Sequence, residues 1–267
     1  CSSLKYYYIL IVFGLFSCLG VSWIMGIRDT KKEFKFVWLA LIIGSIYILI
    51  IPPYVVPDEG VHFATAYKYS NLLMGKESVD ENGTVIVDEE NMGYWLREET
   101  PSQSTYARVM RGIVGKTDKS AEEKGKIRRP LAEYNLGYFP QTIGIVIGRA
   151  MHMNGEQILL LGRWFALFWY CFVMYWAVRI IPVFGKNILF IIGLLPMTIQ
   201  QAMSYNYDSV LNGVSFFLIA YILYLAYDQK RKSVDTKDRI IIIVCTVIIA
   251  TIKFIYSITW SGNVDPK

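Results

Sequence analysis

The chain has 267 residues, of which 54% are apolar and 15% aromatic, and its formal net charge is +5. Soluble domains contain roughly 45–50% apolar residues, and here the excess is concentrated in long runs, which excludes an ordinary soluble protein. The four Cys residues lie far apart and have neither the spacing of a zinc site nor that of a disulfide framework. We therefore expect a polytopic membrane protein that contacts the lipid bilayer and has no nucleic-acid partner.

Six apolar runs predict membrane-spanning helices. Several of them reach the roughly 18–20 residues that a helix needs to cross a bilayer. In chain order the runs are 6–27, 36–56, 157–178, 187–203, 209–227 and 240–252. The expected fold class is all-α, a polytopic transmembrane helical bundle with about six spans.

The same pattern divides the chain into three parts. Residues 1–56 are expected to form two N-terminal transmembrane helices, residues 57–156 an extracytoplasmic loop with an interfacial helix, and residues 157–260 the remaining helices of the bundle. The sequence starts with Cys1 and stops soon after the last run, so we expect the chain to be truncated at both ends.

The distribution of charge predicts the topology. Residues 28–35 carry four basic residues and residues 228–239 carry five, which places both loops in the cytoplasm by the positive-inside rule. Residues 57–135 carry 11 Lys and Arg against 14 Asp and Glu, as expected of a large extracytoplasmic loop. The stretch 135–153 is short and interrupted by Gly, Pro and Arg149, so we expect an interfacial or re-entrant helix on the outer side.

Charged residues directly follow the second apolar run, in the segment PDEGVHF at 57–63. Pro57 suits the first position of a helix, and the helix dipole then favours the carboxylates of Asp58 and Glu59 in the first turn. Asp58 and His62 are four residues apart and share a helix face, where a carboxylate beside an imidazole can orient a hydroxyl and accept its proton. The spacing leaves helix capping and a catalytic site as equal alternatives.

A second polar cluster lies where the 187–203 run ends, within residues 196–213. It contains Gln201, Tyr205, Asn206 and Asp208, and the same topology places it at the outer face. Two distant segments would then bring polar side chains to one face and form a substrate-binding site. The alternative is a polar turn between two helices, with Asp208 as the N-cap of the second helix.

Three cationic residues, Arg149, Arg163 and Lys253, lie in or beside apolar runs. An unpaired charge at that depth is costly, so each is expected either to pair or to extend its charged end to the membrane interface. Together with the acidic clusters they predict a pocket that binds a phosphate group. Extension to the interface alone also explains any one of them.

The order of these features resembles the GT-C class of integral-membrane glycosyltransferases. The relevant features are a span, PDEGVHF, a long outer loop, EYNLGYFPQTIGIVIGR at 133–149, and GRWFALFWY at 162–170. More narrowly, PPYVVPDEGVHF, LLPMTIQQAMSYNYDSVLNG and IKFIY resemble a bacterial family of predicted membrane proteins, domain of unknown function 2142, from about residue 36 onward. The additional run at 6–27 departs from the pattern of that family.

The resemblance implies a GT-C-like fold in the bacterial cytoplasmic membrane and transfer of a sugar from a polyprenyl-phosphate donor to a cell-envelope acceptor at the outer face. Asp58 would be the general base, and Glu59 would support it or bind a divalent cation with it. Arg149, Arg163 or Lys253 would neutralise the charge that develops on the phosphate. The alternatives are a transporter or lipid flippase for envelope precursors, or a non-catalytic envelope-assembly protein.

Overall fold

The computed structural model describes residues 2–26, 30–81, 84–87, 102–113, 126–127, 136–227 and 233–260. Much of the loop predicted at 57–135 therefore lies outside the described residues. The elements in chain order are α1 (Ser2–Gly26), α2 (Lys32–Ile50), α3 (Glu59–Leu73), β1 (Val85–Ile86), α4 (Gln103–Ile113), β2 (Lys126–Ile127), η2 (Leu136–Tyr138), α5 (Phe139–Ala150), α6 (Gly155–Ile180), α7 (Val183–Gly193), α8 (Pro196–Met203), α9 (Asp208–Tyr227) and α10 (Thr236–Trp260).

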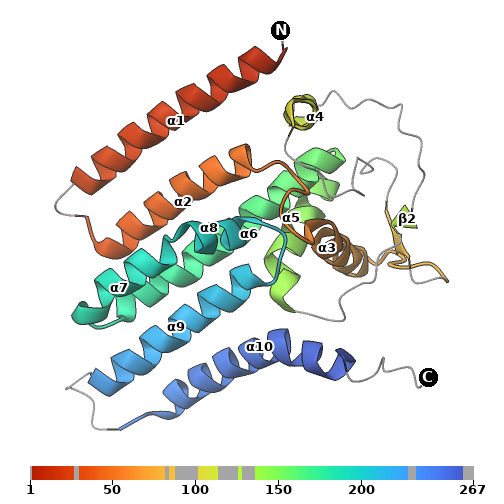
Figure 1. Cartoon of the computed structure of the whole chain (residues 1–267). Coiled ribbons are helices and arrows are strands. Elements are labelled where there is room, and N and C mark those ends of the chain that lie inside the picture. Colours follow the sequence, from red (N-terminus) through yellow and green to blue (C-terminus); the bar gives the residue numbers. More distant parts are fainter. Residues whose placement is uncertain are drawn as a thin grey trace.

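The long helices lie side by side, with their ends at two opposite sides of the molecule (Figure 1). One side, at the left of the figure, holds the ends of α2, α6 and α10 that carry Lys32, Arg179 and Lys237, and is called the basic end. The opposite side holds α3, α4 and α5, together with the first turns of α6 and the junction between α8 and α9. This side is called the α3 end.

Three helices of the described chain, α2, α6 and α9, are long and apolar enough to cross a membrane. The bent pair of α7 and α8 adds a fourth candidate if it forms one span, and α1 contributes a shorter apolar stretch, Ile11–Gly26. The structure thus agrees with a mostly helical membrane protein. The prediction of about six spans is not confirmed, because the described residues support three or four.

The run 187–203, predicted as one span, forms two helices bent by 67°. The break falls between Gly193 and Pro196, and Pro196 has no N–H with which to continue a helical ladder. Tyr170 of α6 donates its hydroxyl to the carbonyl of Gly193 (2.8 Å), and Thr198 donates to the carbonyl of Ile192 (3.1 Å). Two carbonyls near the break are thereby paired, as a lipid environment requires.

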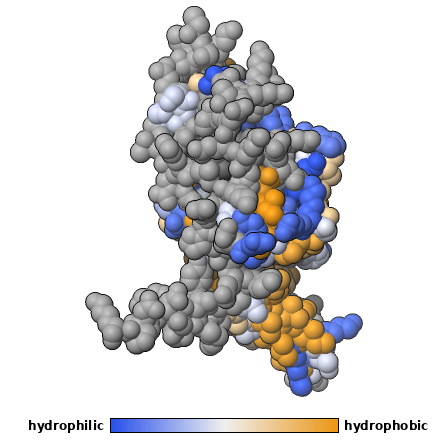
Figure 2. Space-filling view, turned by 90° about the vertical axis from the view of Figure 1, so that its right-hand side faces the viewer, coloured by the Kyte–Doolittle hydropathy of each residue, from blue (hydrophilic) through white to orange (hydrophobic). Residues whose placement is uncertain are grey.

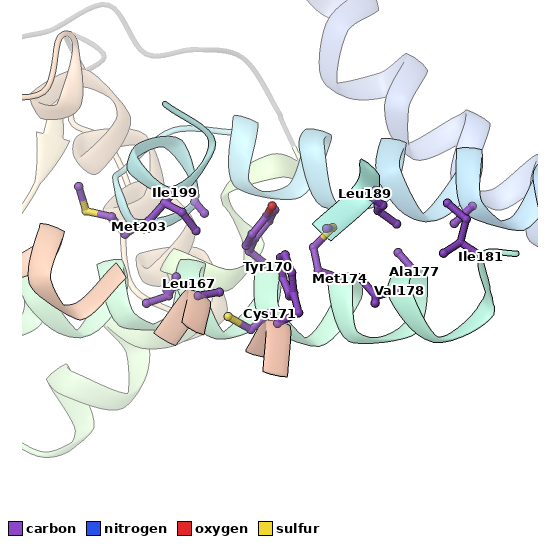
Figure 3. Close-up of a cluster of buried hydrophobic side chains, with 14 of the residues drawn as sticks. Leu167, Tyr170, Cys171, Met174, Ala177, Val178, Ile181, Leu189, Ile199 and Met203 are labelled. Carbon is purple, nitrogen blue, oxygen red and sulfur yellow. The ribbon is translucent and has the colours of Figure 1, made fainter. Parts of the chain in front are cut away.

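The bent pair follows α6 along its length (Figure 3). Leu189 of α7 lies near Val178, whereas Ile199 of α8 lies near Leu167, closer to the start of α6. Helices α7 and α8 together therefore run from the basic end to the α3 end, like one span with a single break. This arrangement brings the loop after α8 to the N-terminus of α3.

The long helices expose large apolar side chains, among them Phe16 on α1, Phe172 on α6 and Val247 on α10. Such surfaces are unusual in a soluble protein and suit contact with lipid tails. Figure 2 views the α3 end, where hydrophilic residues cover much of the described surface, while a hydrophobic region lies lower, at the level of α10.

Two smaller features complete the α3 end. Helix α5 has 12 residues, too few to cross a bilayer, and is not among the candidate spans, as predicted for 135–153. It packs closely on α6, since a Cβ at Gly144 would lie 2.8 Å from the Cα of Gly162. Strands β1 and β2 pair antiparallel, with Val85 opposite Ile127.

Candidate functional site

A buried ion pair joins the start of α3 to α6. Arg163, in the third turn of α6, donates from Nε to Oε1 of Glu59 (2.8 Å) and from Nη2 to Oε2 (2.6 Å). Both side chains are fully buried, with 0% exposure. Such a bidentate pair between arginine and carboxylate is strong and highly directional. It fixes the position of α3 relative to the bundle, although the two residues are 104 positions apart in the sequence.

The guanidinium of Arg163 also holds the loop between α2 and α3. It donates from Nη1 to the carbonyl of Ile51 (2.6 Å) and from Nη2 to the carbonyl of Pro52 (3.2 Å). With its two bonds to Glu59, these contacts use four of the five N–H groups that an arginine offers. The donors that a phosphate group would need are therefore already engaged.

The carboxylate of Glu59 is equally saturated. Besides Arg163 it accepts the backbone N–H of Tyr54 (2.8 Å) and of Tyr205, in the loop between α8 and α9 (3.3 Å). A buried charge pair is stable only when bonds of this kind satisfy its remaining groups. Burial, and then the nearby Glu59 carboxylate, raises the pKa of both tyrosine hydroxyls well above 10, so both are neutral at physiological pH.

Asp58 stands next to this ion pair but is exposed. Its backbone has a φ of 58°, in the left-handed region, which costs a non-glycine residue about 1–2 kcal/mol. Its side chain makes no capping bond to α3. Asp58 thus occupies the N-cap position of α3 through its backbone, whereas its carboxylate does not cap the helix by a hydrogen bond. The carboxylate is left accessible at a position that the buried pair fixes.

His62 lies one turn after Asp58 and is half-buried. Its Nδ1 forms a hydrogen bond with the hydroxyl of Tyr138 (2.5 Å), and the ring of Tyr207 stands perpendicular to it at 5.8 Å. Burial lowers the pKa of His62 below 6.5, although the carboxylates of Asp58 and Glu59 act in the opposite direction. The imidazole is therefore neutral at physiological pH and can accept a proton.

The second predicted cluster is at the α3 end as well, in the loop between α8 and α9. Gln141 of α5 is fully buried and donates to the carbonyl of Asn206 (2.7 Å) and to the hydroxyl of Ser209 (3.3 Å). Asn206 in turn accepts the backbone N–H of Ser209 through Oδ1 (3.1 Å). Asn206 therefore fills the capping role that one alternative gave to Asp208.

Asp208 takes part in a different chain of hydrogen bonds. Its Oδ2 accepts from Nε2 of Gln201 (3.3 Å), and Oε1 of Gln201 accepts from Nδ2 of Asn212 (2.9 Å). All three residues are half-buried, so part of this polar chain is accessible from outside. The structure brings Asp58, Glu59 and His62 together with the loop of Tyr205 and Asn206 at one end of the bundle.

Arg149 is not part of this group. It donates from Nη1 to Ser70 (2.6 Å) and Asn71 (2.7 Å), and its guanidinium lies 4.4 Å from the ring centroid of Tyr67. Ser70 follows Asp58 by 12 positions, about 18 Å along a helix. Arg149 thus fastens the C-terminal half of α3 to α5. Lys253 belongs to α10, and its side chain lies outside the described part of the structure.

The expected divalent cation at Asp58 and Glu59 does not fit this geometry. Both oxygens of Glu59 already accept hydrogen bonds from Arg163 or from backbone N–H groups. Among the described residues there is also no group of three or more His, Cys, Asp or Glu side chains with metal-binding geometry. We therefore assign no chemical step to a metal ion.

Sequence reasoning missed the contribution of Gly162. A Cβ at this position would lie 1.8 Å from the hydroxyl oxygen of Tyr205, so only glycine leaves space for that buried ring. The ring belongs to the residue whose N–H binds Glu59. The one signal in the sequence is the pair Gly162–Arg163, which places a residue without a side chain next to an unexpected cation in an apolar run.

No curated protein and no solved structure matches this chain. A family model described as predicted membrane protein (DUF2142) matches residues 41–259, which include every element from the last turns of α2 to α10. The match contains the ion pair, Asp58, His62 and the loop between α8 and α9. The chain therefore belongs to the DUF2142 family of predicted membrane proteins.

Proposed function

We propose that this chain is a glycosyltransferase-like membrane enzyme that moves a sugar from a polyprenyl-phosphate donor to a cell-envelope acceptor. The reaction takes place at the α3 end, which faces the outer side of the bacterial cytoplasmic membrane. The basic residues of the opposite end support this orientation by the positive-inside rule. The resemblance of the sequence to GT-C enzymes supports the reaction type, and in this proposal the chain forms a GT-C-like bundle with about six spans.

The observation that carries the proposal is the state of Asp58. Its carboxylate is exposed and makes no capping bond, and its backbone is held in a left-handed conformation beside the buried pair of Glu59 and Arg163. Strained conformations persist where the surroundings enforce them, and they are concentrated at functional sites. A rigidly held, accessible carboxylate is what a general base requires.

In the proposed reaction Asp58 accepts the proton of an acceptor hydroxyl while the hydroxyl oxygen bonds to the anomeric carbon of the sugar. The bond from that carbon to the phosphate oxygen breaks, and polyprenyl phosphate leaves with the electron pair. The neutral imidazole of His62 orients the hydroxyl through its free edge, because its Nδ1 is bonded to Tyr138. No acid is needed for the leaving group, since a phosphate leaves readily.

The other site residues position these groups. Glu59 and Arg163 hold the loop before α3 and act through Asp58, so Arg163 is a positioning residue rather than a phosphate ligand in this proposal. Tyr205 and Asn206 connect that loop to α9. The half-buried pair of Gln201 and Asp208 lies at the same end, where we propose that it contacts the hydroxyl groups of the sugar. Lys253 remains the candidate from the sequence for the phosphate charge.

A transporter is the main alternative, and the middle of α6 disfavours it. Transporters hold their substrate near the bilayer midplane, between polar groups on interrupted helices. Here the segment of α6 from Leu167 to Ala177 buries mainly apolar side chains against its neighbours (Figure 3), and the hydroxyl of Tyr170 is bonded to a backbone carbonyl. Polar side chains are instead gathered at the α3 end.

The test compares Asp58→Asn with Asp235→Asn, the same change at an exposed position of the basic end. Each variant is reconstituted in nanodiscs with a polyprenyl-phosphate sugar that carries a radiolabel, together with an envelope extract as acceptor. We expect Asp58→Asn to lower the release of polyprenyl phosphate by roughly 10²–10⁴-fold with donor binding retained. Asp235→Asn should match the wild type.

Two results would contradict the proposal. Turnover by Asp58→Asn at the wild-type rate would show that the carboxylate has no catalytic role. Movement of intact donor lipid across a vesicle membrane, without release of polyprenyl phosphate, would identify a flippase instead.

A further inference from the structure

A cavity of about 300 Å³ lies between α1, α2, α4 and α6, beside the loop that leads to Asp58. Its volume is at the lower end of the range for ligand-binding pockets, about 300–1,000 Å³. Its walls come from α1, α2, the loop after α2, α4 and α6, and they include Ser45, Pro52, Tyr106, Val109, Leu160 and Trp164.

The chemistry of the walls specifies a hydrocarbon ligand. Apart from two hydroxyl groups and one indole, the lining side chains are entirely apolar. Ser45 donates its hydroxyl to the carbonyl of Leu41, and Tyr106 donates to the carbonyl of Ile50 (2.7 Å). A polar ligand would lose its hydration without finding a free hydroxyl among these walls, which is unfavourable.

The position of the cavity identifies the source of that hydrocarbon. Helices α2 and α6 are both candidate spans, and α2 ends at Ile50. Ser45 is five residues before this end, or about 7.5 Å along the helix, so the cavity lies beside the segment of α2 that is long and apolar enough to cross a membrane. Trp164 supplies an indole, which is typical of the interface between lipid and water. Lipid tails are the apolar molecules available at this depth.

Helix α4 is held firmly against this cavity. Tyr106, Val109, Met110 and Ile113 are spaced as one face of a helix, and all four line the cavity. Gly112 lets α4 approach α6 closely, since a Cβ there would lie 2.7 Å from the side chain of Glu156.

The first turn of α6 also fixes the C-terminal end of α4. Asn154 donates to the carbonyl of Gly112 (2.9 Å), and Gln157 donates to that of Ile113 (3.1 Å). Asn154 and Gln157 also form the capping box that starts α6. The apolar face of α4 is therefore built against the cavity and is not a loose contact.

We propose that this cavity holds part of the hydrocarbon tail of a membrane lipid. Pro52 lines the cavity, and its carbonyl accepts a hydrogen bond from Arg163, which binds Glu59 next to Asp58. A lipid seated here has its head group beside the loop that carries Asp58. That the lipid is the sugar donor rests on the proposed function, whereas the tail site itself does not.

The test uses two photoreactive lipids in nanodiscs, each with a diazirine in its tail: an isoprenyl phosphate and a phosphatidylcholine. Cross-linked peptides are mapped by mass spectrometry in the wild type and in two variants. Val109→Trp fills the cavity, and Val247→Trp is the control, with the same change on the exposed surface of α10. Val109→Trp should reduce labelling of the peptides around Met110 and Leu160 by roughly tenfold or more, because overpacking excludes the tail. Val247→Trp should leave that labelling unchanged.

Preferential labelling by the isoprenyl probe supports a donor tail, and labelling by both probes supports a general lipid tail. Equal labelling of these peptides in Val109→Trp and the wild type would overturn the proposal. Ser45→Leu fills the cavity from the opposite wall and gives the same test if Val109→Trp does not fold. Asp58→Asn should keep the labelling, so loss of sugar transfer and loss of the tail site are separable results.

Discussion

Replacing Glu59 by Gln tests the role of the buried ion pair. The substitution keeps the size of the side chain but leaves the guanidinium of Arg163 charged, fully buried and without its counter-ion. Removing one partner of a buried pair costs about 3–5 kcal/mol, a large part of the roughly 5–15 kcal/mol that stabilises a typical fold. Each kcal/mol lowers the melting temperature of a chain of this size class by about 2–4 °C, so we expect a decrease of about 6–20 °C.

The measurement is thermal unfolding of the purified protein in detergent, followed by tryptophan fluorescence. Glu77→Gln is the matched control, because Glu77 is exposed and its replacement should change stability by less than about 0.5 kcal/mol. Arg163→Met leaves the carboxylate of Glu59 buried without its cation and should lower the melting temperature by a similar amount. Melting of Glu59→Gln within the error of Glu77→Gln would refute this reasoning.

Three further predictions concern the packing and protonation of the same region. Gly162→Ala should lower stability by about 1–3 kcal/mol in thermal unfolding, because its Cβ would lie 1.8 Å from the hydroxyl of Tyr205. Gly14→Ala is the control, since a Cβ there has nothing within 4 Å and should not lower stability. Equal melting temperatures of the two variants would contradict this prediction. Tyr170→Phe leaves the carbonyl of Gly193 unpaired at the helix break and should lower stability by about 1–3 kcal/mol. Tyr175→Phe is the control, because it removes only an exposed hydrogen bond and should not change stability. An unchanged stability of Tyr170→Phe would show that another donor binds this carbonyl. Since burial lowers the pKa of His62, the unfolded state takes up its proton first, and stability should fall as the pH decreases from 6.5 through the folded pKa. An NMR titration of His62 with a midpoint at or above 6.5 would contradict that sign.

Hydrophobicity predicted the main helices because it is a property of local segments. The runs at 36–56, 157–178 and 209–227 correspond to α2, α6 and α9, which are long and apolar enough to span a membrane. The short stretch at 135–153 contains η2 and α5, not a span. The break within 187–203 was missed, although Pro196 marks it, because mean hydropathy does not register a missing N–H donor.

The roles of the charged residues were harder to predict because they depend on contacts between distant segments. Nothing near Glu59 in the sequence indicates that its partner is Arg163, and nothing near Arg149 indicates Ser70 and Asn71. The sequence predicted that Pro57 begins the helix and that Asp58 lies in its first turn, on one face with His62. Instead α3 begins at Glu59, and Asp58 is the N-cap residue in a left-handed conformation. Residue spacing does not predict this backbone angle of 58°.

The orientation of the bundle is most directly tested by labelling single cysteines in a variant that lacks the four native Cys. Asp58→Cys places a thiol at the α3 end, and Val183→Cys places one at the basic end, where Val183 is 82% exposed. In intact cells without an outer barrier, a membrane-impermeant maleimide should label position 58 at once and position 183 only after lysis. Labelling of position 183 from outside, or of both positions from the same side, would contradict an outward-facing site.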